Sequence, residues 1–257
     1  MILPIGDDNS DRTTTPYVNY LLIAVNLLVF VFLQGMGTNE RFTYAWATVP
    51  EEIVTGRDIT TRPRVVVEPE TRQRLEVPGL QPTPGSVYLT LLTSMFMHGG
   101  WAHILGNMLF LWIFGDNIED RLGHLRYLIF YLVCGLIASL AQVFMTVALS
   151  SDPAGLLVPS LGASGAISGV LGGYVLLFPR RQVHVILFRF LTTVPAYVAL
   201  GLWFLFQFIS GIGVLGGGTQ MGGVAYAAHV GGFIAGLLLV KVFAIGRGAP
   251  APQWRRY

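Results

Sequence analysis

The sequence predicts an all-α membrane protein whose helices cross the bilayer six times. Of its 257 residues, 53% are hydrophobic and only 12% are charged, and the mean hydropathy is +0.60. Soluble proteins carry about 25% charged residues. The net charge of +2 is small and the basic residues do not gather in one segment, so we expect no nucleic-acid partner. The protein is therefore expected to have the lipid bilayer as its surroundings.

The membrane spans can be counted from five stretches that contain no Asp, Glu, Lys or Arg: 13–39, 77–115, 127–151, 153–179 and 190–240. A membrane helix needs about 20 mostly apolar residues, so each of the first four stretches holds one span. The fifth is long enough for two, and a glycine-rich segment at 211–223 divides it. We expect spans at about 17–35, 102–119, 127–149, 163–179, 193–211 and 225–243.

Basic residues in the short loops predict the orientation. The segments after the fourth and sixth spans carry basic residues without any acid: Arg180, Arg181, Arg189, Lys241, Arg247, Arg255 and Arg256. Positively charged loops stay in the cytoplasm. We therefore expect both termini there, with 1–16 as a short N-terminal segment and 246–257 as a basic tail. The first span is expected to be a retained signal-anchor, because no basic region or cleavage site precedes it.

The segment between the first two spans, 36–101, is expected to be a long outer loop. Residues 40–76 hold 13 of the 30 charged side chains of the chain. Within it, 65–69 and 74–78 are typical of short strands or extended arms. The apolar piece 86–97 is too short to span a bilayer, so we expect it at the interface.

Polar side chains stand near the outer ends of three predicted spans. His103 and Asn107 are four residues apart in span two, so they share one helical face. Ser164 opens span four, and His229 lies near the start of span six. These spans all begin at the outer face and a helix rises 1.5 Å per residue, which predicts a similar depth for the four side chains. Polar groups inside a membrane are costly and indicate function.

Glycines recur every four residues on the fourth and sixth spans: Gly165, Gly169, Gly173, Gly232 and Gly236. Such stripes let helix backbones approach closely. Contact between the two spans would bring the hydroxyl of Ser164 to the imidazole of His229. A serine becomes a nucleophile when a neighbouring base removes its proton. His103 and Asn107 could then donate hydrogen bonds to a developing oxyanion.

Each of these residues also has a structural interpretation. Ser164 alone could serve packing, one intramembrane histidine could bond a carbonyl, and Asn107 could join two helices. Their joint occurrence at one depth favours a site. By contrast, we expect a structural role for the polar group at the inner end of span two, which comprises Asp116, Asn117, Glu119, Asp120 and Arg121. Among the aromatic residues, we expect a position on a helix surface for Tyr174. We expect contact with lipid for Trp203, Phe204, Phe206 and Phe208, with a lateral gate as the alternative.

Four motifs occur in order along these spans: His98-Gly-Gly-Trp-Ala-His-Ile-Leu-Gly-Asn107, Glu119-Asp-Arg121, Gly162-Ala-Ser-Gly165 and Ala228-His-Val-Gly-Gly232. Together they resemble the rhomboid intramembrane serine proteases, over about 86–243. The resemblance implies a six-helix bundle in the cell membrane and a serine endopeptidase that needs no cofactor and no metal. The substrates it implies are single-pass membrane proteins, cut near the outer end of a helix and usually after a small residue.

The resemblance also implies roles for individual residues. Ser164 would be the nucleophile and His229 the base of a dyad without an acid. The oxyanion hole would consist of His103, Asn107 and the backbone N–H of Ser164. The sequence departs from many relatives at Ser168, where they carry an aromatic residue under the histidine ring, so another residue must orient His229. A Trp-Arg pair found in the outer loop of some relatives is also absent.

Other functions stay open from the sequence. A catalytically inactive relative could bind membrane clients, although Ser164 and His229 are both present. A metal-dependent enzyme could use His98, His103 and His229, but no Asp, Glu or Cys is expected at that depth, and zinc sites commonly include one. A transporter is disfavoured because the spans lack charged residues at mid-depth. The identity of the substrate and the oligomeric state stay open.

Overall fold

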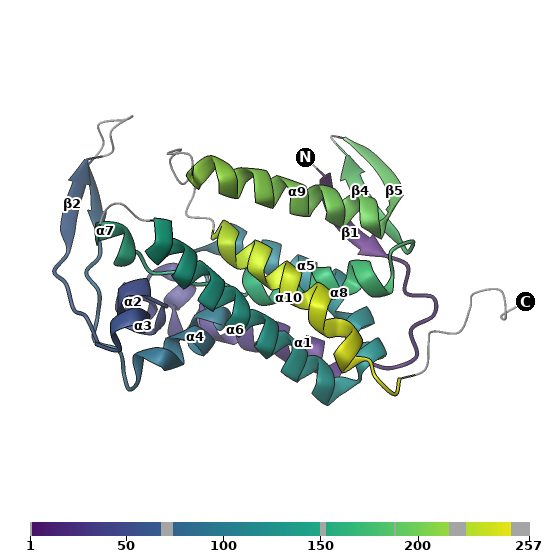
Figure 1. Ribbon diagram of the computed structural model, residues 1–257, viewed down its shortest axis with the longest axis horizontal. Helices are drawn as coiled ribbons and strands as arrows, with labels where there is room; N and C mark the ends of the chain where they lie inside the picture. The colour runs from purple at the N-terminus through teal and green to yellow at the C-terminus, as the bar shows by residue number, and fades with distance from the viewer. Residues whose placement is uncertain (1, 68–73, 150–152, 188, 216–224, 248–257) are drawn as a thin grey trace, which may run out of the picture.

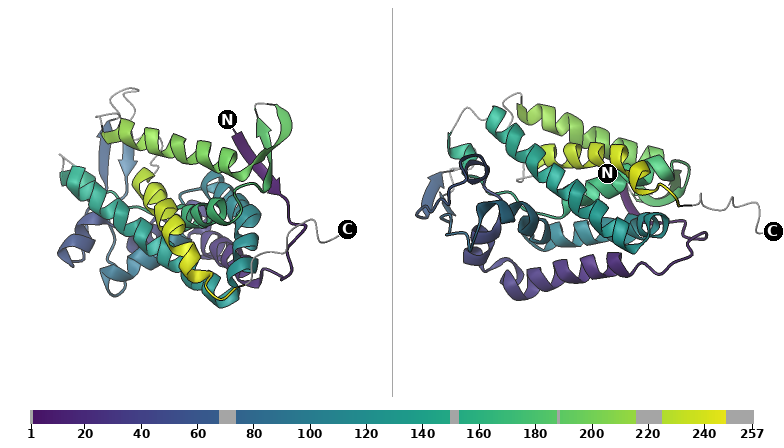
Figure 2. Two further views of the ribbon diagram at one scale, coloured as in Figure 1. Left: turned by 45° about the vertical axis from the view of Figure 1, so that its right-hand side comes forward. Right: turned by 60° about the horizontal axis from the view of Figure 1, so that its bottom comes forward.

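The fold is a bundle of helices with two small β-sheets, described by a computed structural model for residues 2–67, 74–149, 153–187, 189–215 and 225–247. Its principal helices are α1 (Tyr17–Leu28, continued by the π-helical η1, Val29–Leu33), α5 (Trp101–Leu122), α6 (His124–Leu149), α8 (Ser164–Leu177), α9 (Ala196–Leu215) and α10 (Tyr226–Phe243). Figures 1 and 2 show α1 and α9 on opposite sides of the bundle, with α10 and α8 between them.

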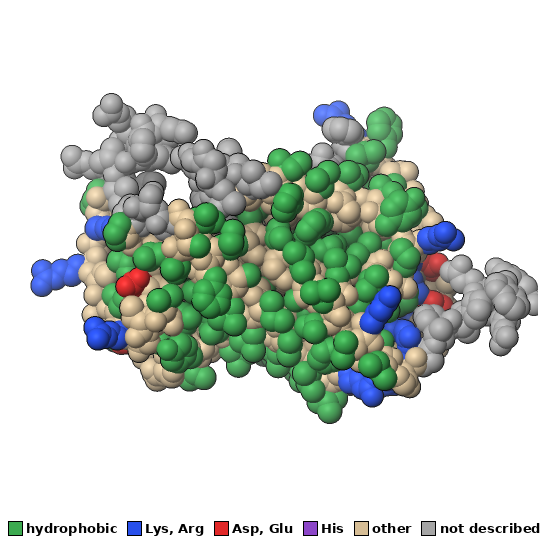
Figure 3. Space-filling model, in the orientation of Figure 1, with side chains coloured by type: hydrophobic (Ala, Val, Ile, Leu, Met, Phe, Trp, Pro, Cys, Tyr) green, Lys and Arg blue, Asp and Glu red, His purple; other side chains and the backbone are tan. Residues whose placement is uncertain are grey.

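Two of the described helices, α6 and α10, are long and apolar enough to cross a membrane, and α1 with η1, α8 and α9 are shorter apolar helices. In Figure 3, hydrophobic side chains cover the middle of the visible face, whereas Lys, Arg, Asp and Glu lie toward its two ends. Helices throughout the bundle expose large apolar side chains, among them Leu105, Trp112, Leu125, Phe144, Phe206 and Leu238. Exposed apolar surface on this scale marks a face that contacts lipid or protein.

The segment between α1 and α5, predicted as the outer loop, folds into short elements rather than one domain of its own. These are η2 (Gly35–Gly37), α2 (Glu40–Trp46), α3 (Pro50–Thr55), β2 (Arg64–Val67), β3 (Arg74–Val77), η3 (Val87–Leu89), α4 (Thr90–Thr93) and η4 (Ser94–Phe96), and the short α7 (Pro153–Leu156) lies near them. Strands β2 and β3 pair antiparallel, with Val65 opposite Glu76. The prediction of short strands in this loop is confirmed.

The prediction of an all-α fold is wrong for the opposite end of the bundle. There β1 (Ile2–Asp7), β4 (Gln182–Leu187) and β5 (Phe190–Pro195) form an antiparallel sheet in the order β1-β4-β5. The predicted start of span five at 193 therefore falls inside β5, and α9 begins at Ala196. Along β4, Val183 and Val185 are buried and alternate with exposed neighbours, the pattern of a half-buried strand. Of these strands, only β5 lies within a stretch that the sequence analysis assigned to a span, and a criterion based only on missing charge cannot distinguish such a strand from the start of a helix.

Helices α8 and α10 pack with almost no space between their backbones, as the glycine stripes predict. A Cβ atom added at Gly232 would lie 2.1 Å from the carbonyl oxygen of Gly165, and one at Gly236 would lie 1.9 Å from that of Gly169. The stripe on α8 also faces α6, because a Cβ atom at Gly169 would lie 2.4 Å from the Cβ of Cys134. Glycine at these positions permits the contact that sets the separation of the two helices.

The polar group at the C-terminal end of α5 binds the N-terminal segment. Glu119 accepts hydrogen bonds from the backbone N–H groups of Val18 (2.9 Å) and Asn19 (2.7 Å), so it caps α1, whose own preceding residue provides no side-chain cap. Asp120 accepts backbone hydrogen bonds from Thr13 and Thr14. The expected structural role is confirmed for these two carboxylates.

The prediction for Tyr174 is wrong, because its side chain is completely buried in the core. Its hydroxyl donates to Asp7 of β1, and Asn117 donates to the same carboxylate oxygen at 2.8 Å. Burial raises the pKa of Asp7 to about 7. Tyr174 therefore links α8 to the N-terminal strand β1 through a contact between residues 167 positions apart in the sequence.

Candidate active site

Ser164 and His229 lie in hydrogen-bond contact across the junction of α8 and α10. Ser164 is the first residue of α8, and His229 is in the first turn of α10. The Ser164 Oγ atom is 2.7 Å from Nε2 of His229. The imidazole is only 9% exposed. A hydroxyl that donates to an unprotonated imidazole nitrogen has the geometry of a nucleophile beside its base.

His103 lies beside the turn that leads into Ser164. Its Nδ1 atom accepts a hydrogen bond from the backbone N–H of Gly99 at 3.3 Å. Gly162, two residues before Ser164, has a φ of +129°, and a Cβ atom there would be 2.9 Å from both Cε1 and Nε2 of His103. A side chain at 162 would therefore be strained and would displace the ring, so glycine lets His103 approach the serine turn.

Asn107 is buried, and its amide nitrogen Nδ2 has no hydrogen-bond partner among the described residues. The residue follows His103 by one helical turn on the same face of α5. Leaving such a donor unpaired in a buried place costs about 1–3 kcal/mol. A buried donor of this kind is available to a group that enters the site.

His98 is buried behind His103, with the two rings edge to face at 5.1 Å between centroids. Gln34 fixes its backbone, accepting from the N–H of His98 at 2.8 Å and donating to its carbonyl at 3.0 Å. Burial lowers the pKa of His98 to about 3, so the ring is neutral. Among the described residues, no three His, Cys, Asp or Glu side chains are grouped as metal ligands.

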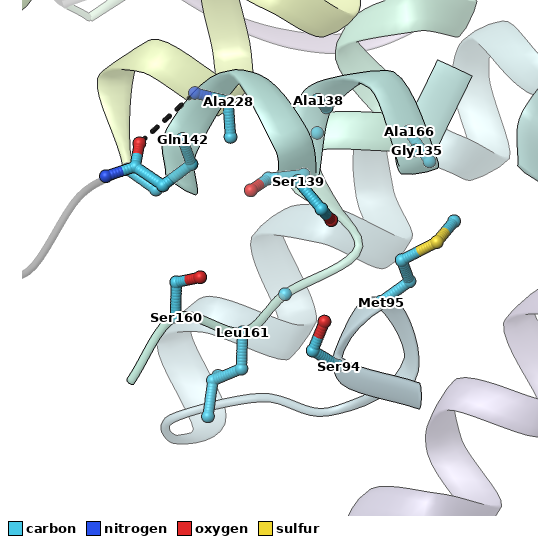
Figure 4. Close-up of a pocket in the computed structure, with 14 residues that line it drawn as sticks. Ser94, Met95, Gly135, Ala138, Ser139, Gln142, Ser160, Leu161, Ala166 and Ala228 are labelled. Atoms are coloured by element: carbon cyan, nitrogen blue, oxygen red, sulfur yellow. Dashed lines mark hydrogen bonds between the residues drawn. The ribbon is translucent and has the colours of Figure 1, made fainter. Parts of the chain in front are cut away.

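A pocket lies beside Ser164, between α6, α8 and the segments at 94–95 and 160–162 (Figure 4). Its polar lining comes from Ser94, Ser139, Gln142 and Ser160, and its apolar lining from Met95, Leu161 and small residues such as Ala138 and Ala228. Gln142 accepts a hydrogen bond from the backbone N–H of Ala228, as Figure 4 shows. Ser164 thus lies at the wall of a pocket that has space for a small group only.

The segment between α1 and α5 supports the strand-like segment that precedes Ser164. Thr48 and Ser160 exchange two backbone hydrogen bonds, of 3.0 and 2.8 Å. Gly162 donates its N–H to the carbonyl of Ser94 at 2.9 Å. The hydroxyl of Thr48 in turn donates to the carbonyl of Thr90 at 2.8 Å. These bonds connect the charged loop to the position of the serine, a relationship that the sequence does not reveal.

Two predictions about side chains near His229 are resolved by the structure. Ser168 donates its hydroxyl to the carbonyl of Ser164 at 2.6 Å, so it does not reach the histidine. Trp203 and Phe204 do not face only lipid, because the first packs 6.0 Å from the ring of His229 and the second stacks on Phe233 at 4.5 Å. The two remaining aromatic residues of that group, Phe206 and Phe208, are exposed, and their contact with lipid stays a prediction.

Gln207, a buried residue of α9, is a site residue that the sequence did not predict. Its Oε1 atom is 2.7 Å from Nδ1 of His229, on the side of the ring opposite Ser164. The available signal is a single amide within the otherwise apolar run Leu202-Trp-Phe-Leu-Phe-Gln-Phe-Ile209. A polar residue inside a predicted span indicates a functional site, and Gln207 meets that criterion as the two histidines, Ser164 and Asn107 do.

Comparisons with known proteins agree with the resemblance that the sequence motifs indicate. A family model described as a rhomboid domain matches residues 85–245. The chain is 33% identical over 150 residues to the mitochondrial Rhomboid protein 1 of Saccharomyces cerevisiae, covering 58% of this chain and 40% of the relative. It is 27% identical over 234 residues to the Rhomboid protease GluP of Bacillus subtilis, covering 90% and 35%, and 33% identical over 156 residues to RHOMBOID-like protein 4 of Arabidopsis thaliana, covering 60% and 34%. It thus spans less than half the length of these relatives. The matched domain includes every residue described above for the candidate site except Gln34 and Thr48. The chain belongs to the rhomboid family.

Proposed function

We propose that the protein is a serine endopeptidase that cleaves membrane-spanning segments of other proteins near the outer face of the cell membrane. The observation that carries this proposal is the 2.7 Å contact between the Oγ of Ser164 and Nε2 of His229. The proposed membrane arrangement has six spans, corresponding to α1 with η1, α5, α6, α8, α9 and α10. Both termini lie in the cytoplasm and the outer loop lies outside.

In the proposed mechanism, His229 removes the hydroxyl proton as Ser164 Oγ attacks the carbonyl carbon of the scissile peptide. The tetrahedral intermediate collapses, the proton passes from Nε2 to the departing amine, and an acyl-enzyme forms on the serine. Water then attacks the acyl carbon, with His229 again accepting a proton. Collapse of the second intermediate releases a carboxylic acid and restores the serine hydroxyl.

Three groups support stabilisation of the oxyanion. The backbone N–H of Ser164 belongs to the first turn of α8, where N–H groups lack partners within the helix and the helix dipole favours negative charge. The ring of His103 lies beside the turn that leads into α8, and the unpaired Nδ2 donor of Asn107 is one helical turn from His103 on the same face of α5. Donors that are already oriented stabilise charge that develops in the transition state.

The pocket beside Ser164 supports cleavage after a small residue. Met95 occupies its inner side: a Cβ atom at Gly135 would lie 2.0 Å from the terminal methyl of Met95, so the pocket has no room to deepen there. A substrate helix must also unwind to present a peptide bond to a buried serine. We therefore propose single-pass membrane proteins with small residues at the cleavage site as substrates.

The proposal is tested by cleavage of a membrane-embedded model substrate after reconstitution into liposomes. We expect Ser164→Ala and His229→Ala each to abolish cleavage while the melting temperature stays close to that of the original protein. Addition of a chelator should leave the rate unchanged. Turnover by either variant would refute the dyad. Loss of activity with phenanthroline and recovery with zinc would support a metal enzyme instead, and no cleavage by the unmutated protein would support a client-binding relative.

A further inference from the structure

The side of His229 that faces away from Ser164 is held by α9. The amide oxygen of Gln207 is 2.7 Å from Nδ1 of the ring. Both side chains are almost fully buried, with exposed fractions of 8% for Gln207 and 9% for His229. Trp203, one turn earlier on α9, lies against the ring at 6.0 Å between centroids with 36° between the planes. Helix α9 therefore contacts both the edge and the face of the imidazole.

The chemistry of this contact selects one form of the histidine. A neutral imidazole carries one N–H, and an amide oxygen can only accept a hydrogen bond. Gln207 therefore places the proton on Nδ1, which leaves the lone pair of Nε2 directed at the hydroxyl of Ser164. The nitrogen that remains free for chemistry is set by the bond that the other nitrogen makes.

Gln207 differs from the rest of its helix. Along the described part of α9, the neighbouring side chains Leu205, Phe206 and Phe208 are apolar and exposed, whereas the amide is turned inward. Burying an amide without a partner is unfavourable, so its position is explained by the bond to His229. Ser168, the residue at the position where an aromatic support is expected, is engaged with the carbonyl of Ser164.

We propose that Gln207 is a positioning residue that completes a Ser164–His229–Gln207 unit. This inference rests on the proposed function, in which His229 is the base. When Nε2 takes the serine proton, the ring becomes positively charged, and the bond from Nδ1–H to the amide oxygen becomes a charge-assisted one. Gln207 stabilises that ion without accepting its proton. It touches neither the substrate nor the serine and acts only through the histidine.

The test compares Gln207→Leu, which keeps the approximate volume and removes the acceptor, with Gln207→Glu, which restores an acceptor oxygen. Phe206→Leu is the matched control on the exposed side of the same helix. We expect Gln207→Leu to lower kcat about 10²-fold, below the roughly 10⁴-fold effect of losing the correct tautomer in triads that contain a carboxylate. KM should stay within about twofold, because the amide does not bind substrate. Gln207→Glu should recover most of the rate, and Phe206→Leu should retain it.

A spectroscopic measurement separates positioning from packing. The ¹⁵N spectrum of protein labelled at histidine, with the signal of His229 assigned from His229→Ala, reports which ring nitrogen carries the proton. We expect the Nδ1–H form in the unmutated protein and a mixture of tautomers in Gln207→Leu. If Gln207→Leu does not fold, the tautomer of the unmutated protein decides: Nδ1–H supports the inference and Nε2–H overturns it.

The outcomes distinguish this inference from the function on which it rests. Full kcat in a folded Gln207→Leu, with active unmutated protein, overturns the positioning role and leaves the dyad intact. An unmutated protein that neither cleaves substrate nor reacts at Ser164 refutes the proposed function, and the inference with it. A lowered melting temperature with unchanged kcat in Gln207→Leu would show that the amide serves stability alone.

Discussion

Gly232 lies directly against the carbonyl oxygen of Gly165, so that a Cβ atom at position 232 would be 2.1 Å from that oxygen. The contact is one residue beyond Ser164 on α8 and three beyond His229 on α10. The separation of the two backbones at this point therefore sets the distance between the hydroxyl and the imidazole. The packing of α8 against α10 thus determines the geometry of the candidate dyad.

We expect Gly232→Ala to destabilise the protein and to abolish cleavage. The added methyl group meets backbone rather than a flexible side chain, so α10 must shift, at a cost of about 1–3 kcal/mol or more. Gly201→Ala on α9 is the control, because a Cβ atom there has no heavy atom within 4 Å. Thermal unfolding and cleavage are measured on both variants. Normal stability and activity in Gly232→Ala would contradict the close approach of α8 and α10.

Asn107→Ala tests whether the unpaired amide stabilises the transition state. Losing one oxyanion donor typically lowers kcat about 10²–10³-fold, or roughly 3–4 kcal/mol, and KM should change little. Ser164 should still react with an electrophilic probe, because His229 is unchanged. Gly106→Ala, with open space at its Cβ position, is the matched control on α5. A lower melting temperature with near-normal kcat would instead assign Asn107 to helix packing.

The buried carboxyl of Asp7 should make the stability of the folded protein depend on pH. Burial raises the pKa of this carboxyl to about 7, whereas in the unfolded chain it is near 4. Folding thus favours the protonated form, so the contribution of Asp7 to stability falls as the pH rises from about 4 to about 7. Asp7→Asn keeps an acceptor for Tyr174 and removes the charge. We expect it to raise the melting temperature at pH 8 more than at pH 5, and an equal change at both would contradict this.

The orientation in the membrane is tested by cysteine labelling in intact cells. In a Cys134→Ala background, an impermeant thiol reagent should label Val54→Cys in the outer loop and should not label His184→Cys in β4 until the cells are permeabilised. Both positions are exposed, so differences in burial do not explain the result. Labelling of position 184 in intact cells would reverse the orientation.

The sequence predicts the helices better than the sheets. An apolar stretch of about 20 residues indicates a membrane helix, whereas a short one fits either a helix or a strand. The stretches that became α1, α5, α6 and α8 each correspond to one long helix, and the fifth corresponds to α9 and α10. The residues of β4 and β5 form only short apolar runs, and the pairing of β4 with β1 joins segments about 180 positions apart. Nothing local to 182–195 indicates that contact.

The candidate site could likewise be predicted only in part from the sequence. Ser164, His229, His103 and Asn107 could be grouped because topology predicts their depth. Gln207 could not be assigned to His229 from the sequence, since the direction that each helix presents to its neighbour depends on packing. Tyr174 was misplaced for the same reason, because its partner is 167 positions away.

If Ser164 is an activated nucleophile, its hydroxyl should react with a fluorophosphonate probe. The solubilised protein is incubated with the probe, and the modified peptide is identified by mass spectrometry. We expect a single adduct on Ser164 that disappears in Ser164→Ala and is strongly reduced in His229→Ala. Absence of an adduct on folded protein, or an equal rate of labelling in His229→Ala, would contradict it.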